Sequence, residues 1–171
     1  MQLTVPALLT ILVALAPTHT FAVDAADLKF ASDAAVAGLA EIEFANLAKQ
    51  KAKTDSIRDY AEHLLSDHQQ ANEKLKAIAA QKNVTLPSDI TANHKAARDK
   101  LAALDGPEFE KAYIEIMVKD HRKAVSDFQT EIKRTQDTDF KTFASDTEPK
   151  LREHLEQAQR LQGQFSSHAK R

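Results

Sequence analysis

Apolar residues recur every three or four positions along four long stretches of this chain, as in "YAEHLLSDHQQANEKLKAIAAQ" from Tyr60 to Gln81. This spacing places them on one face of an α-helix. Turn signals such as Asp105-Gly106-Pro107 separate the stretches. The pattern predicts long helices over residues 27–53, 56–82, 107–136 and 139–168. No alternating pattern of useful length predicts a strand.

Four long helices with one apolar stripe each bury those stripes by forming an all-α four-helix bundle. The segment between the second and third long helices contains a short extra helix, expected at about 91–104. The connector that holds this short helix could cross the bundle or return as a hairpin, and both topologies stay open. Pro149 falls inside the last long helix, where it is expected to kink the helix or break it locally.

The N-terminal stretch "MQLTVPALLTILVALAPTHTFA" has an apolar centre that is shorter than the roughly 20 residues of a membrane span. It predicts a signal peptide over residues 1–22 with cleavage after Ala22, although no Lys or Arg precedes the apolar centre. Residues 23–171 then form a single domain. We expect a periplasmic or secreted protein without stable membrane insertion after cleavage.

Charge and composition exclude several classes of function and of binding site. Twenty-three basic residues nearly balance 25 acidic ones, so the chain has no strongly basic character for nucleic acid. The absence of cysteine excludes disulfides and thiolate metal sites. No Gly-rich loop or serine nucleophile motif is present, and no organic cofactor is expected. A homo-oligomer is compatible with the sequence, which names no protein partner.

Each apolar stripe carries one ionisable residue near the middle of its helix. These residues are Glu41, His68, His121 and His154. Because each lies about midway along its helix, all four should share one layer of the bundle. Burying an unpartnered polar group costs on the order of 1–3 kcal/mol, so the layer needs an internal partner or a ligand.

An acidic residue directly precedes each of the three histidines, namely Asp67, Asp120 and Glu153. These side chains should lie at the edge of each stripe and accept the second N–H of an imidazole on an adjacent helix, as carboxylates near metal-bound histidines do. The other histidines (His19, His63, His94 and His168) lie off the stripes and are expected to be solvated. Tyr60 and Tyr113 should pack in the core with solvated hydroxyls.

Three interpretations of the layer formed by Glu41 and the three histidines stay open. Glu41 and the three histidines could bind one divalent transition metal, since imidazole with one carboxylate suits Zn, Cu, Ni or Fe. The same residues could instead form a buried hydrogen-bond network in a structural or envelope-stress protein. A metal-dependent hydrolase or redox enzyme would need an open coordination position and a cleft. The sequence indicates neither a substrate nor a physiological role.

Four motifs resemble an exported bacterial family catalogued as domain of unknown function 4142: "FASDAAVAGLAEIEFANLA", "LLSDH", "LDGPEFEKAYIEIMVKDH" and "LREHLEQAQRL". The resemblance covers about residues 28–161 and implies a ferritin-like helical bundle. Its most specific parts fall on Asp67-His68, Asp120-His121 and His154-Leu155. The Glu-x-x-His pairs of di-iron bundles are absent, since Leu65, Val118 and Leu151 precede the histidines by three.

Overall fold

The structure is a computed structural model that describes residues 23–168, with side chains through residue 165. It contains the helices α1 (Ala25–Lys51), α2 (Asp55–Gln81), α3 (Ala92–Ala102), α4 (Gly106–Arg134) and α5 (Thr138–His168), and these residues include no strand. The predicted all-α class is confirmed. Helix ends differ from the expected positions by at most two residues. The expected signal peptide lies outside the described residues.

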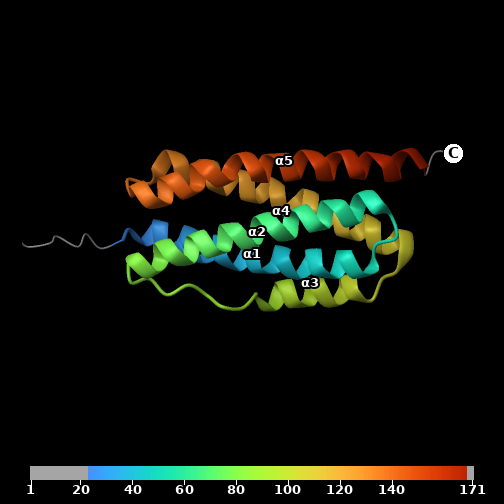
Figure 1. Cartoon of the computed structure of the whole chain (residues 1–171), viewed down its shortest axis with the longest axis horizontal. Helices are drawn as coiled ribbons and strands as arrows, with labels where there is room; N and C mark the ends of the chain where they lie inside the picture. The colour runs from blue at the N-terminus through green and yellow to red at the C-terminus, as the bar shows by residue number, and fades with distance from the viewer. Residues whose placement is uncertain (1–22, 169–171) are drawn as a thin grey trace, which may run out of the picture.

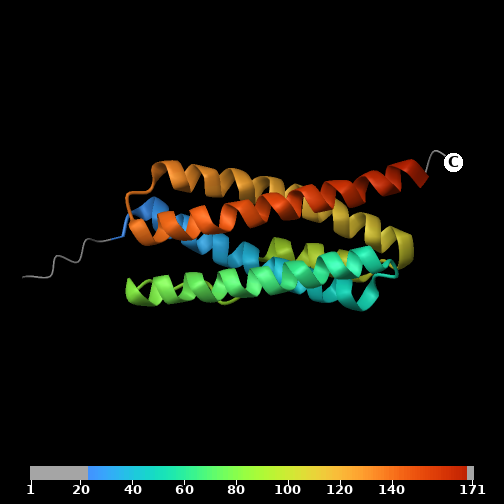
Figure 2. The ribbon, with the colours of Figure 1, turned by 45° about the horizontal axis from the view of Figure 1, so that its top comes forward.

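The four long helices form two antiparallel hairpins that pack on each other (Figures 1 and 2). Helix α1 pairs with α2 and α4 pairs with α5, while α1 also contacts α4 and α2 contacts α5. The connector after α2 runs back along the bundle, so that α4 begins at the end where α1 turns into α2. Helices α2 and α4 therefore run in the same direction, and the connector is a crossover.

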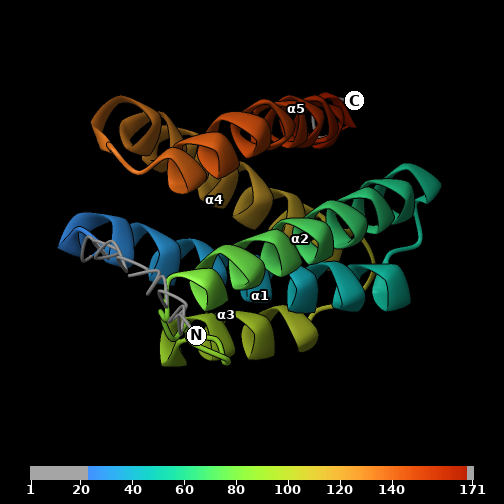
Figure 3. The same ribbon diagram turned by 60° about the vertical axis from the view of Figure 1, so that its left-hand side comes forward.

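The short helix α3 covers the outer side of α1 (Figure 3) and also contacts α4. Two side chains attach the connector to the bundle: Ile90 and Leu101 are almost fully buried in the core. Removing such aliphatic side chains from water contributes roughly 1.5–3 kcal/mol each. This burial explains why the connector follows the bundle instead of forming a tight hairpin.

A buried carboxylate holds the turn between α1 and α2. The Glu110 side chain of α4 accepts hydrogen bonds from the backbone N–H groups of Lys53 and Thr54, both at 2.7 Å, and from the Thr54 hydroxyl at 2.8 Å. Such charge-assisted bonds are stronger than neutral ones. At the opposite end of the bundle, Lys82 after α2 forms an ion pair with Asp137 in the α4–α5 turn.

The apolar core is divided into two parts along the bundle axis. One cluster, around Phe44, Leu64 and Tyr113, fills the end near the α1–α2 turn. The other, around Phe30 and Phe140, fills the end near the α4–α5 turn. In α2, α4 and α5 the predicted histidines lie between the residues of the two clusters, so the polar layer separates two dry halves of the core.

Helix α5 continues through Pro149 without a break. Of the two expected outcomes, a local break is wrong and a kink stays a prediction. Pro149 is exposed, whereas Phe143 and Leu151 on the same helix are buried. A proline in a helix interior costs about 3 kcal/mol, and burial of the apolar side chains before and after it offsets that cost. None of the described helices is both long and apolar enough to cross a membrane.

Candidate metal centre

Three helices bring three histidines to one point in the core. His68 of α2, His121 of α4 and His154 of α5 are each less than a tenth exposed. One ring nitrogen from each lies within 4.8 Å of the others. The Nε2 atoms of His68 and His121 are 3.4 Å apart. We call these residues the inner histidine group.

Hydrogen bonds assign the tautomers of two of these rings. His121 Nδ1 is 3.0 Å from the carbonyl oxygen of Met117, so this nitrogen carries the proton and donates. His154 Nε2 is 3.0 Å from Asp67 Oδ2 and donates to that carboxylate. In a neutral imidazole the other nitrogen is then an acceptor. His121 Nε2, which faces His68 Nε2, and the buried, unpartnered His154 Nδ1 therefore each present a lone pair.

Burial keeps the inner histidines neutral. Desolvation lowers the pKa of His121 to about 3 and that of His68 well below its ordinary value. Burial also lowers the pKa of His154, while the hydrogen bond to Asp67 acts in the opposite direction. Ligating imidazoles must be deprotonated. At neutral pH the group can therefore bind a cation without first losing protons to solvent.

Glu41 of α1 is buried as expected but lies outside the inner histidine group. Its Oε1 is 4.0 Å from His121 Nδ1, on the side of the ring that donates to the helix backbone. Its Oε2 is buried without a hydrogen-bond partner. Desolvation, together with the nearby charge of Asp120, raises the pKa of Glu41 well above its ordinary value. Glu41 as a fourth ligand stays a prediction.

Two tyrosines lie close to this carboxyl group. Tyr60 and Tyr113 pack edge to face with ring centres 6.3 Å apart, and Tyr60 donates to the backbone oxygen of His154 at 3.2 Å. Tyr113 is completely buried and its hydroxyl has no partner. Because the Tyr60 hydroxyl is also buried, the expectation of solvated hydroxyls is wrong for both. Burial, followed by the proximity of Tyr60 and Glu41, raises the pKa of Tyr113.

The three acidic neighbours of the histidines differ in their contacts. Asp67 accepts from His154 across the α2–α5 interface. Asp120 is partly buried, and desolvation raises its pKa. Glu153 is exposed and accepts from Gln157 at 3.4 Å. Among the hydrogen bonds of the described residues, only Asp67 shows the carboxylate–imidazole contact that the sequence suggested.

Sequence reasoning missed His63. Its Nε2 lies 3.3 Å from Asp67 Oδ2, and its ring packs edge to face on His154 at 5.2 Å. His63, Asp67 and His154 each offer a ligand atom within 4.8 Å of the others, and we call them the outer group. The four-residue spacing of His63 and Asp67, which places both on one helix face, is a signal that could have identified the pair.

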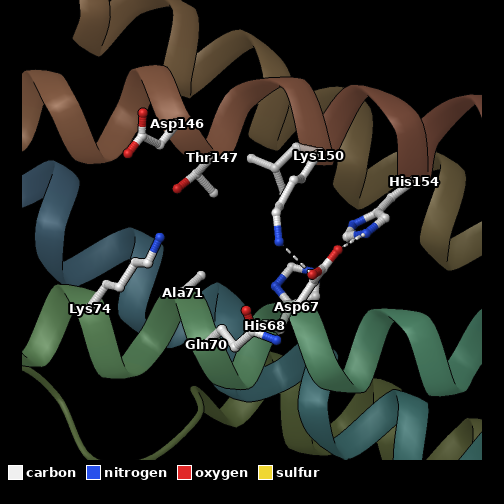
Figure 4. Close-up of a pocket in the computed structure, with 10 residues that line it drawn as sticks. Asp67, His68, Gln70, Ala71, Lys74, Asp146, Thr147, Lys150 and His154 are labelled. Atoms are coloured by element: carbon white, nitrogen blue, oxygen red, sulfur yellow. Dashed lines mark hydrogen bonds and ion pairs between the residues drawn. The ribbon is translucent and has the colours of Figure 1, made fainter.

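A small cavity opens beside both groups, between α2 and α5 (Figure 4). It holds about 30 Å³, and its lining includes Asp67, His68, Lys150 and His154. Asp67 lies at the centre of this view, bonded to Lys150 through one oxygen and to His154 through the other. A cavity of this size accommodates one or two waters and is too small for an organic substrate.

Solved structures with the same fold include two proteins of a family called DUF305. The Deinococcus radiodurans fragment is 12% identical with a TM-score of 0.75, covering 83% of this chain and 98% of its own. A putative secreted protein from Streptomyces coelicolor is 18% identical with a TM-score of 0.68, covering 78% and 88%. CopM in its Cu(II)-bound form is 18% identical with a TM-score of 0.71, covering 81% and 97%.

Comparison of the sequence with protein families identifies the family of this chain. Curated proteins yield no match to this chain. A family match extends over residues 13–161 and includes all four predicted ligands and their acidic neighbours. On the strength of this match, the chain belongs to the family described as domain of unknown function DUF4142.

Proposed function

We propose that this protein is an exported metal-binding bundle that holds one transition-metal ion at His68, His121 and His154. The observation that carries the proposal is the convergence of three buried, neutral imidazoles from three different helices. Burying one imidazole needs only a hydrogen-bond partner. Bringing three rings to one point, at the boundary between two apolar clusters, gives them the spacing of ligands.

The distances fit a metal ion. Metal–imidazole bonds of about 2.0–2.1 Å at a tetrahedral angle place two nitrogens roughly 3.3 Å apart. The Nε2 atoms of His68 and His121 are 3.4 Å apart, and His154 Nδ1 is an unpartnered third donor. A bound cation would favour loss of the Glu41 proton by charge attraction, and the carboxylate would then compensate the charge of the cation. As a fourth ligand, Glu41 would have to move from the Nδ1 side of His121.

A structural hydrogen-bond network is the second candidate, because 3.4 Å also suits a hydrogen bond between the two Nε2 atoms. A network that exists for stability should satisfy its members. Here Glu41 Oε2, Tyr113 Oη and His154 Nδ1 are buried without partners. A bound ion with its water or carboxylate ligands accounts for these atoms better than a closed network does.

Copper is the first candidate for the ion. Imidazole suits copper, zinc, nickel and iron alike, and the likeness to CopM in Cu(II)-bound and Cu(I)-bound forms favours copper among them. The structural likeness to a putative secreted protein and the N-terminal signal pattern support export.

The test is metal content and thermal stability of tag-free protein purified from the periplasm. We expect about one ion per chain and a lower melting temperature after chelation, because a ligand at a hundredfold excess over its dissociation constant stabilises the fold by roughly 2.7 kcal/mol. His121→Ala should abolish the chelator effect, and His94→Ala, outside both groups of candidate ligands, should keep it. An unchanged chelator effect in His121→Ala, or two ions per chain, would refute this site.

A further inference from the structure

The outer group lies between solvent and the inner histidine group. An open hollow of about 410 Å³ between α2 and α5 is lined by His63, together with Asp59 and Arg160. The small cavity on the other side is lined by Asp67, His68 and His154. The outer group therefore lies between the solvent-filled hollow and the small cavity, and the small cavity contacts His68 and His154 of the inner histidine group.

The outer group has the ligand types and spacing of a metal site. Asp67 Oδ2 is 3.3 Å from His63 Nε2 and 3.0 Å from His154 Nε2. His63 is about two-fifths exposed, whereas Asp67 is one-eighth exposed and His154 is buried. Exposure thus falls steadily from His63 towards the inner histidine group. An ion that met His63 first would find its next ligands progressively deeper.

We infer that His63, Asp67 and His154 form an outer coordination site through which a transition-metal ion enters the inner histidine group. This inference rests on the proposed function. His154 is the ligand common to both groups, with Nε2 towards Asp67 and Nδ1 unpartnered in the interior. When the ion is bound at the outer group, it is held by His154 Nε2, and the ring proton of His154 is on Nδ1. When the ion is bound at the inner histidine group, it is held by His154 Nδ1, and the ring proton is on Nε2, which donates to Asp67.

Lys150 pairs with the other carboxylate oxygen of Asp67, Oδ1, while Oδ2 faces His63 and His154. Its Nζ lies 2.6 Å from Asp67 Oδ1, and its side chain is about half exposed. Ion pairs this exposed contribute little to stability, so an arriving metal ion can displace the ammonium group at small cost. Lys150 therefore competes with the ion for Asp67 and slows its entry.

Tyrosine fluorescence provides the readout. The chain has two tyrosines and no tryptophan, both tyrosines are buried, and Tyr60 contacts the backbone of His154. Copper(II) bound at the inner group should quench this emission. Mixing the metal-free protein with Cu²⁺ in a stopped-flow instrument therefore gives the rate of loading, and mixing loaded protein with a chelator gives the rate of release.

His63→Ala should slow loading roughly tenfold, by analogy with the loss of a residue that supports a metal site. An entrance changes both rates by the same factor, so release should slow equally and the dissociation constant should stay at the wild-type value. A structural role for His63 would instead change the affinity. His94→Ala is the control. A wild-type loading rate in His63→Ala, or an altered dissociation constant, would overturn the entrance.

Lys150→Met provides the second test. It should speed loading more than Lys74→Met does, because Lys74 lines the same cavity but only Lys150 pairs with Asp67 among the described contacts. Equal effects of the two variants would overturn competition by Lys150. The two proposals also fail separately. An unchanged effect of chelator on the melting temperature of His121→Ala would refute the inner site, whereas equal rates in His63→Ala and the wild type would refute the entrance alone.

Discussion

The metal-free protein should lose stability below pH 6.5 because His121 folds in its neutral form. Its pKa is about 3 in the folded state and 6.5 in the unfolded chain. A depressed folded pKa means that the unfolded state binds more protons, so stability falls as pH drops through this window. The slope is about 1.36 kcal/mol per pH unit. Between pH 7 and pH 5, His121 alone should cost about 2 kcal/mol.

Comparison with His121→Leu isolates this contribution. Glu41 acts in the opposite direction, because its raised folded pKa makes folding more favourable as pH falls, but Glu41 is present in both proteins and cancels. Burial is the largest cause of the lowered pKa of His68 and of His154 and acts in both proteins, so their contributions cancel to first order. The gap in unfolding free energy between wild type and variant should therefore shift by about 2 kcal/mol in favour of the variant at pH 5.

Urea unfolding with excess chelator at pH 7, 6 and 5 measures this gap. Val118→Ala is the matched control, because Val118 is a buried residue of the same helix and neither its side chain nor alanine titrates. Its gap to the wild type should not depend on pH. A gap between wild type and His121→Leu that is equal at pH 7 and pH 5 would refute the burial of a neutral imidazole.

Two further predictions concern the scaffold, each measured by urea unfolding. In Gly38→Ala, the new Cβ would lie 2.2 Å from Asn72 Oδ1, so the free energy of unfolding should fall by about 1–3 kcal/mol. Adding Asn72→Ala should restore part of this stability. Additive losses in the double variant would contradict the clash. Glu110→Ala should lose about 1–3 kcal/mol, because the backbone N–H groups of Lys53 and Thr54 lose a charged acceptor. Wild-type stability would contradict the assigned bonds.

The helices were predictable because their signals are local. Apolar spacing and turn residues lie in the segments that they specify, and the observed ends agree within two residues. The course of the connector was not predictable. It depends on where Ile90 and Leu101 find apolar partners, and those partners come from distant parts of the chain. The continuity of α5 through Pro149 depends in the same way on packing by Phe143 and Leu151.

The inner histidine group was accessible from sequence for a different reason. A polar residue with apolar neighbours three, four and seven positions away lies on the buried face of its helix. This spacing identifies buried positions on each helix separately. It correctly placed Glu41 in the interior. It could not say which side of His121 the carboxyl group would face, because that depends on the rotation of α1 relative to α4. The structure places it on the Nδ1 side.

His63 shows the limit of the same spacing rule. Selecting residues at the centre of the apolar face leaves out residues at its edge. A residue at the edge, however, is the one that contacts the neighbouring helix. Asp67 was retained only because it precedes a histidine, and both of its imidazole contacts involve edge geometry that no single helix specifies. A metal site inside a bundle would need a path for the ion as well as ligands, and the path that we propose here runs along the edges of α2 and α5. Searching such edges for His and Asp four residues apart, next to a buried histidine, would have identified the outer group from sequence.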